Sequence, residues 1–332
     1  MEALSVEKIP EGSQWQYEPK WDGFRCLAFR DGKQVRLQSK AEKDLSRYFP
    51  ELVQALLKIK ADKFVLDGEI VIPMGKVLSF DSLLQRIHPA ATRIKKLSTE
   101  TPAHYIVFDI LLDDKDRSLI GETLGSRRKK LEAFAKKYFA IAETVHLSPA
   151  TDRIAQTKAW AKKASNALDG IIAKRVDLPY ESGTREGMQK IKARKTADCV
   201  VGGFRYASRG KQVGSLLLGL YDKERKLNHV GYVGTAGKLG GKELTAKLEK
   251  LIEAPGFTGH APGGPSRWST ERTGEWEPLK PSLVVEVEFD HVTGGRFRHG
   301  TKFLRWRPDK KPAQCSMDQI EQKKGAPFDL VR

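Results

Sequence analysis

The chain has 332 residues, which exceeds the usual size of a single domain and predicts two compact domains. Its 59 Lys and Arg residues outnumber 42 Asp and Glu residues, and the net charge of +17 favours a polyanionic partner such as nucleic acid or an acidic membrane surface. It has no apolar run of the roughly 20 residues that a membrane span needs, no signal-peptide core and no Cys-x-x-Cys pair, so we expect a soluble cytoplasmic protein without disulfides or a zinc ribbon.

Short β-rich segments alternate with amphipathic segments over the first 196 residues. Residues 48–60, 127–137 and 157–167 place apolar side chains at helical spacing among charges. Residues 65–71 and 105–112 are largely apolar and β-rich, as buried strands are, and turn residues lie at their ends. These elements predict an α+β domain over residues 1–196.

From residue 198 onward, glycines interrupt a series of β-rich stretches. The strands predicted here are residues 200–206, 215–221, 229–233 and 283–291. A helix is predicted over 242–252, and a loop rich in Gly and Pro follows over 254–269. This layout predicts that residues 197–332 form a five-strand oligonucleotide-binding (OB) barrel with an inserted helix.

One segment, residues 18–25 (EPKWDGFR), places Lys20 beside an acid, a glycine turn and Arg25. This arrangement suits a lysine nucleophile that attacks a nucleotide phosphate, although the same string also fits an exposed hairpin bend. A lysine amine attacks only when it is neutral, so its site has to depress a pKa whose reference value is near 10.4.

We expect nearby cations to lower the pKa of Lys20 and also to hold the phosphates. The alternative is that they are ordinary solvated side chains on strand faces, which is the usual position of lysine in a basic protein. The candidates are Arg25, Lys174, Lys190 and Lys192.

Five further blocks follow in a fixed order: VLDGE (65–69), YIVFD (105–109), LDGIIAKR (168–175), MQKIK (188–192) and FLRWRPDK (303–310). In content and order, these blocks and residues 18–25 resemble the ATP-dependent DNA ligases, which are covalent nucleotidyltransferases. The resemblance covers nearly the whole chain. The flanking residues 78–81, 85–86 and 196–205 look most similar to small bacterial ligases of the ligase C and ligase D type.

The resemblance implies an adenylation (nucleotidyltransferase) domain over residues 1–196, followed by an OB-fold domain over 197–332. It implies that Lys20 becomes covalently adenylated, that Glu18 lies beside the adenine and that Arg25 lies near the ribose and phosphate. By the same resemblance, Glu69 would contact the ribose hydroxyls or a metal, and Phe108 would stack on the adenine. Considered alone, Asp-Gly-Glu after a strand also fits a plain turn, and a Phe in an apolar strand is more often a core residue.

The terminal block resembles the family's last motif, which meets the ATP pyrophosphate when the OB domain closes. Arg305 and Lys310 are its candidate binding residues, and the alternative is a basic surface strand. Phosphoryl transfer needs Mg²⁺ or Mn²⁺ to neutralise the triphosphate, and the carboxylates of Glu69 and Asp169 are the candidate ligands.

The chain departs from the common family pattern at two positions. Many ligases have Glu where Asp169 stands, so the shorter side chain predicts that metal contact at this position runs through water. Relatives often have Arg where Lys40 stands, and lysine cannot form the bidentate fork of arginine.

The sequence therefore predicts a monomeric enzyme that seals nicks in duplex DNA, most naturally in DNA repair. Lys20 would take AMP from ATP and pass it to the 5′-phosphate of the nick, and the 3′-hydroxyl would then displace AMP. One alternative is an RNA ligase or a GTP-using, capping-type nucleotidyltransferase. The other alternative is a catalytically silent basic module that binds DNA.

Overall fold

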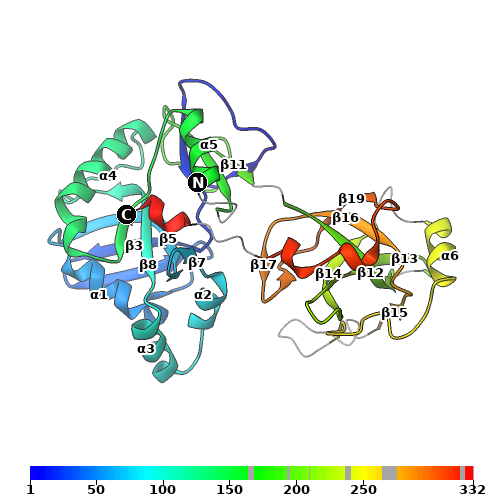
Figure 1. Cartoon of the computed structure of the whole chain (residues 1–332). Coiled ribbons are helices and arrows are strands. Elements are labelled where there is room, and N and C mark those ends of the chain that lie inside the picture. The colour runs from blue at the N-terminus through cyan, green and yellow to red at the C-terminus, as the bar shows by residue number, and fades with distance from the viewer. Residues whose placement is uncertain are drawn as a thin grey trace. The chain divides into compact units, whose positions relative to one another are not determined.

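The computed structural model describes residues 1–163, 168–192, 195–208, 210–235, 241–263, 275–321 and 326–331. It divides into two compact units, one formed by Met1–Ala193 with Lys323–Arg332 and the other by Arg194–Gln322. The first unit combines helices with strands, whereas the second is built mainly of strands (Figure 1). None of the helices within the described residues has the length and apolarity that a membrane crossing requires.

A five-stranded sheet with the order β4-β3-β5-β8-β9 forms the centre of the first unit. Neighbouring strands pair antiparallel, except that β9 runs parallel to β8. Most residues of β5 and β8 are buried, which explains why residues 65–71 and 105–112 were recognisable as strands. The strands are Phe24–Asp31 (β3), Gln34–Ser39 (β4), Lys63–Val71 (β5), His104–Leu112 (β8) and Val145–Leu147 (β9).

Helices α1 and α4 pack against this sheet and build the larger apolar core, which contains Leu56 of α1, Leu131 of α4 and Leu66 of β5. Helix α1 begins at Pro50, whose fixed φ suits a first helical turn, and α4 begins after Thr123, whose hydroxyl caps it. Both helices confirm the sequence prediction. The helices are Pro50–Lys58 (α1), Phe80–Arg86 (α2), Ala91–Glu100 (α3) and Leu124–Tyr138 (α4), with 3-10 turns at Ser46–Tyr48 and Phe139–Ile141.

A second sheet of the first unit has the order β1-β11-β10-β2. Helix α5 packs on it, and Trp15, Tyr17, Trp160 and Ile171 form an apolar cluster there. The predicted helix over 157–167 corresponds to α5 as far as residue 163, and residues 164–167 lie outside the described residues. The elements are Leu4–Ser5 (β1), Trp15–Pro19 (β2), Ile154–Lys163 (α5), Gly170–Arg175 (β10) and Met188–Lys192 (β11).

The end of the chain belongs to the first unit. Phe328, in the 3-10 turn Pro327–Leu330, is 1% exposed in the cluster around Trp15, and its ring meets the rings of His104 and His146 edge-on. This turn lies beside the hairpin of Pro73–Met74 (β6) and Val77–Leu78 (β7). The structure thus differs from the expected second domain of 197–332, because Phe328 finds its apolar cover in the first unit.

The second unit has the strand order β14-β13-β12-β16-β19, and a parallel bridge between Val233 and Thr301 links β14 to the residue before β19. The strands thereby close as a barrel, and α6 lies between β14 and β16 along the chain, which confirms the expected OB fold. The elements are Lys195–Tyr206 (β12), Val213–Tyr221 (β13), Leu227–Gly234 (β14), Lys242–Glu249 (α6), Glu277–Pro278 (β15), Val284–Phe289 (β16), Val292–Thr293 (β17), Arg296–Phe297 (β18) and Lys302–Trp306 (β19).

Each of the four strands predicted in this unit overlaps an observed strand: 200–206 lies in β12, 215–221 in β13 and 229–233 in β14, while 283–291 contains β16. The predicted helix over 242–252 contains α6. In the predicted loop, residues 254–263 hold no helix or strand, and residues 264–269 lie outside the described residues.

Removing the ring of Phe328 should destabilise the first unit. We expect Phe328→Ala to lower its free energy of unfolding by about 3–5 kcal/mol, because the substitution leaves a cavity in a closed apolar cluster. The measurement is native-state hydrogen exchange of β8 peptides by mass spectrometry. Ile141→Ala, which truncates an exposed side chain of the same unit, should change the value by less than about 0.5 kcal/mol. Equal effects of the two substitutions would contradict the packing role of Phe328.

Candidate functional site

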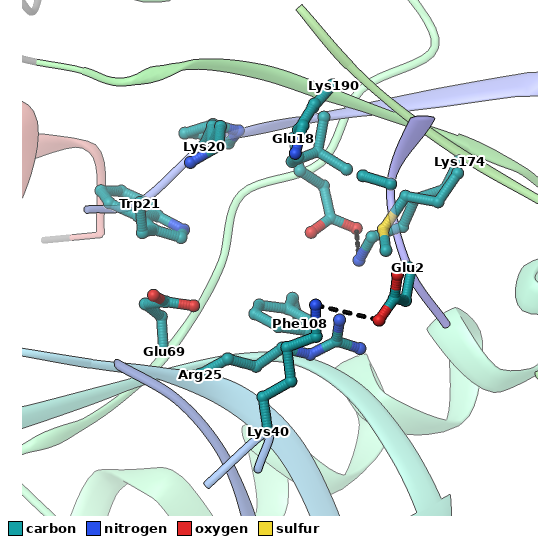
Figure 2. Close-up of a pocket in the computed structure, with 14 residues that line it drawn as sticks. Glu2, Glu18, Lys20, Trp21, Arg25, Lys40, Glu69, Phe108, Lys174 and Lys190 are labelled. Atoms are coloured by element: carbon teal, nitrogen blue, oxygen red, sulfur yellow. Dashed lines mark hydrogen bonds and ion pairs between the residues drawn. The ribbon is translucent and has the colours of Figure 1, made fainter. Parts of the chain in front are cut away.

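A pocket of about 150 Å³ lies between the two sheets of the first unit. Strands β2, β10 and β11 form one wall, and strands β3, β5 and β8 form the facing wall, so the two groups of side chains point toward each other (Figure 2). Eight of the residues singled out in the sequence line it, although they are spread over more than 170 positions of the chain. These residues are Glu18, Lys20, Arg25, Lys40, Glu69, Phe108, Lys174 and Lys190.

Lys20 directly follows β2 and is held beside Asp169, the residue before β10. The Lys20 amide donates to Gly170 O at 3.0 Å, and the Asp169 amide donates to Lys20 O at 3.3 Å. The Lys20 side chain is 22% exposed and its Nζ forms an ion pair with Asp169 Oδ2, whose side chain is 5% exposed. Gly170 has a φ of +138°, and a Cβ there would lie 2.0 Å from Ile191 O, so a glycine is needed where β10 begins beside β11.

Burial lowers the pKa of Lys20, and the positive charges of Lys192 and Lys190 lower it further. The carboxylates of Glu69 and Asp22 oppose this effect and raise the pKa. The sequence-based explanation therefore needs a correction, because desolvation acts more strongly than neighbouring cations. Two of the expected cations form ion pairs with other residues, Lys174 with Glu18 and Arg25 with Asp67.

Glu18 and Lys174 form a buried pair at one end of the pocket. Lys174 Nζ donates to Glu18 Oε1 at 2.9 Å, and Gln16 Nε2 donates to the same oxygen at 2.9 Å. Lys174 Nζ also lies 4.4 Å from the centre of the Phe108 ring, a cation–π contact. The pair therefore fixes a carboxylate next to an aromatic ring.

Phe108 is a pocket residue and not a core residue. It is half-buried and lines the pocket, whereas its neighbours Val107 and Asp109 are buried. Ile172 of β10 also lines the pocket, so the two sheets each present an apolar side chain to the cavity. Sequence reasoning missed Ile172, because its partial exposure depends on strand pairing that a continuous apolar run does not reveal.

Arg25 is oriented by Asp67, another residue that the sequence analysis did not single out. Arg25 Nε and Nη2 donate to the two oxygens of Asp67 at 3.1 and 2.7 Å, and the guanidinium carbon lies 5.7 Å from the Phe108 ring centre. Asp67 is fully buried. An aspartate within an apolar strand needs a cationic partner, and this requirement was the signal available in the sequence.

Glu69 and Asp169 both act on Lys20: Asp169 forms an ion pair with its Nζ, and the charge of Glu69 raises its pKa. Burial raises the pKa of Glu69 to about 8, the charges of Lys20 and Arg25 oppose the shift, and nearby Asp22 and Asp67 add to it. Glu69, whose charged form is disfavoured by burial, gains from an additional positive charge. Together with Asp169 it fits a divalent cation that takes one or two protein ligands and otherwise water and phosphate oxygens. Among the described residues, no group of three or more His, Cys, Asp or Glu side chains is arranged for a metal ion.

The remaining predicted cations differ in position. Lys190 lines the pocket, while Lys192 does not line it but lies near enough to affect Lys20. Lys40 lines the pocket mouth and pairs with Glu2 at 3.0 Å, which Figure 2 shows as a dashed line. Glu2 precedes β1, which pairs with β11, so the pairing of β1 places this carboxylate at the mouth.

Arg305 and Lys310 belong to the second unit and form ion pairs there. Arg305 Nε donates to Glu286 Oε2 at 2.6 Å, and Lys310 Nζ donates to Asp198 Oδ2 at 2.5 Å. Arg307 Nη1 donates to the other oxygen of Asp198 at 2.7 Å. These contacts gather the basic residues of the terminal block in one cluster, and their contact with a nucleotide stays a prediction.

Comparisons with known proteins match both parts of the chain to ATP-dependent DNA ligases. Residues 2–192 match the family model described as ATP dependent DNA ligase domain, and residues 209–310 match ATP dependent DNA ligase C terminal region. The chain is similar to "DNA ligase C1" of Mycolicibacterium smegmatis, with 46% identity over 97% of this chain and 93% of that protein. It is also similar to "Multifunctional non-homologous end joining DNA repair protein LigD" of Mycobacterium tuberculosis, with 34% identity over 92% of this chain and 37% of that protein.

A solved structure from a study of Lig E DNA ligases has the same fold. The likeness has a TM-score of 0.56 at 16% sequence identity, and it covers 92% of this chain and 100% of that chain.

The amine of Lys20 should lose its proton at a lower pH than an ordinary lysine, whose pKa is near 10.4. Competitive labelling with acetic anhydride across a pH series measures this directly, with exposed Lys60 as the internal reference. Lys190→Gln removes a charge that lowers the pKa of Lys20 and should move its half-labelling point to higher pH. Glu69→Gln removes a charge that raises this pKa and should move the point to lower pH. Shifts in the opposite directions would contradict this electrostatic description.

Proposed function

Because the chain belongs to the ATP-dependent DNA ligases, we propose that the pocket of its first unit binds ATP and that Lys20 receives AMP. The protein is an enzyme that seals nicks in duplex DNA with ATP and a divalent cation. In this reaction a lysine takes AMP from ATP, AMP passes to the 5′-phosphate of the nick, and the 3′-hydroxyl displaces it. The observation that carries the assignment is Lys20 itself, a pocket lysine whose pKa is lowered by burial.

Lys20 attacks the α-phosphorus in the first step, a bond forms from Nζ to phosphorus, and the bond to pyrophosphate breaks. In the free protein the ion pair with Asp169 favours the protonated amine. Once Asp169 no longer contacts Lys20, burial and the charges of Lys190 and Lys192 favour the neutral, nucleophilic amine. A divalent cation held by Glu69 and Asp169 would neutralise charge on the triphosphate and the leaving pyrophosphate.

The two apolar side chains of the facing sheets supply the proposed adenine site. Phe108 would stack on one face of the base and Ile172 would cover the other. The Glu18 carboxylate would accept a hydrogen bond from the 6-amino group of adenine. Guanine has a carbonyl oxygen at the 6-position, which cannot donate a hydrogen bond to Glu18, so the site favours ATP over GTP.

The cations divide between the two units. Arg25 would contact the ribose and phosphate, and Lys190, Lys192 and Lys40 would neutralise the phosphates from the pocket side. In the second unit, Arg305 and Lys310 would meet the pyrophosphate in a closed state of the enzyme. This would require Lys310 to exchange the carboxylate of Asp198 for a phosphate.

We further propose that the enzyme acts as a monomer in DNA repair in the bacterial cytoplasm. The support is its similarity to a relative that is named as an end-joining repair protein.

Replacing Lys20 with Ala should abolish the covalent AMP adduct and the sealing of nicked DNA, because no other group would replace the amine. Intact-protein mass spectrometry after incubation with ATP and Mg²⁺ detects the adduct, and gel analysis of a labelled nick detects sealing. Lys60→Ala, which changes an exposed lysine of the same unit, is the matched control and should behave as the parent protein. An adduct on the Lys20→Ala protein would refute the assignment.

Parallel reactions with α-labelled GTP and with nicked RNA separate the alternatives. Label transfer from GTP alone would indicate a capping-type enzyme, and sealing of RNA alone would indicate an RNA ligase. Binding of nicked DNA by the parent protein without any adduct would indicate a silent DNA-binding module.

A further inference from the structure

Tyr180 lies behind the pocket, in the connection between β10 and β11. Its hydroxyl donates to Asp67 Oδ2 at 2.8 Å and accepts from Arg25 Nη2 at 3.3 Å. Arg25 Nη2 donates to the same Asp67 oxygen at 2.7 Å. The three groups thus form a closed triangle of hydrogen bonds on the side of Arg25 that faces away from the cavity. Tyr180 itself is not among the residues that line the pocket.

The ring of Tyr180 is fixed independently of this triangle. The guanidinium carbon of Arg127 lies 5.5 Å from the ring centre, and fully buried Arg127 forms a bidentate pair with Asp109, both bonds being 2.9 Å long. The Tyr180 amide also donates to Ile120 O at 2.9 Å. Backbone and ring therefore hold the hydroxyl in place, and it does not depend on Arg25 for its position.

The triangle matters because Asp67 is fully buried and holds Arg25 through both of its oxygens. Burial and the charge of Asp67 raise the pKa of Tyr180, so the hydroxyl keeps its proton and remains a donor. Without this donor, Asp67 Oδ2 would have one partner fewer in a site that water does not reach. The carboxylate that orients Arg25 would then be less constrained, and the guanidinium would keep its hydrogen bond from Nη1 to Met1 O at 2.6 Å as its fixed contact outside the triangle.

We propose that Tyr180 is a positioning residue for the adenylation reaction, one that fixes the Asp67 carboxylate and through it the direction of the Arg25 guanidinium. It touches neither ATP nor Lys20. The inference rests on the proposed function of Arg25 as a contact for the ribose and phosphate. It adds to that function a residue from a different part of the chain, 113 positions after Asp67.

The test is Tyr180→Phe, which removes only the hydroxyl. The rate of lysyl-AMP formation is measured as a function of ATP concentration in single-turnover experiments, and thermal unfolding is recorded for each variant. We expect kcat/KM for this step to fall about tenfold, the scale of one hydrogen bond to a charged group.

The matched control is Tyr138→Phe. The Tyr138 hydroxyl donates to Asp114 Oδ2 at 2.7 Å, so this variant also breaks a tyrosine–aspartate bond in the first unit, but one on α4. It should leave kcat/KM within about twofold of the parent value, which is the scatter expected for a substitution remote from the site.

A double-mutant cycle with Arg25→Ala separates positioning from a general structural effect. If Tyr180 acts through Arg25, Tyr180→Phe should cause almost no further loss in the Arg25→Ala background. Losses that multiply in the double variant, or equal losses in Tyr180→Phe and Tyr138→Phe, would overturn the proposal for Tyr180. A parent-like rate for Arg25→Ala would instead overturn the proposed role of Arg25, so the two failures are distinguishable.

Discussion

The ion pair between Lys20 and Asp169 is the interaction on which the rest of the pocket depends. It joins the end of β2 to the start of β10, two strands that are paired in one sheet from Ile171 and Pro19 onward. One backbone hydrogen bond joins Asp169 to Lys20 and another joins Lys20 to Gly170, whose missing Cβ leaves room for the backbone of Ile191 in β11. With Lys20 fixed on this wall beside Glu18, the facing sheet completes the pocket with Arg25, Glu69 and Phe108.

The charges of the facing walls are organised in separate pairs, each with its own carboxylate. Lys174 is held by Glu18 and Arg25 by Asp67, and Arg127 is held by Asp109, the residue after Phe108 in β8. Buried pairs of this kind contribute little net stability, because desolvation offsets their attraction, but they fix the direction of each charged group. Their separation also explains why Lys20 owes its lowered pKa to burial first, with Lys190 and Lys192 as the contributing cations.

Much of the site was predictable, because residues of one reaction occur in short blocks whose order along the chain is characteristic. The strands around Glu69 and Phe108 were recognisable because they are apolar and buried on both faces. Partners that lie far apart in sequence were not, since no local pattern links Tyr180 to Asp67 across 113 residues. Phe328 was missed for a similar reason. A single aromatic residue in a polar terminal segment gives no indication of which core it joins.

The position of Phe328 has a consequence for the order in which the protein is made. Residues 194–322 form the second unit, so a ribosome completes that unit before it synthesises the aromatic side chain that closes the apolar cluster beside Trp21. The nascent first unit can form both of its sheets early, but this cluster stays uncovered until residues 327–330 have been synthesised. A chain truncated before Phe328 would retain every pocket residue of the first unit while exposing that apolar surface.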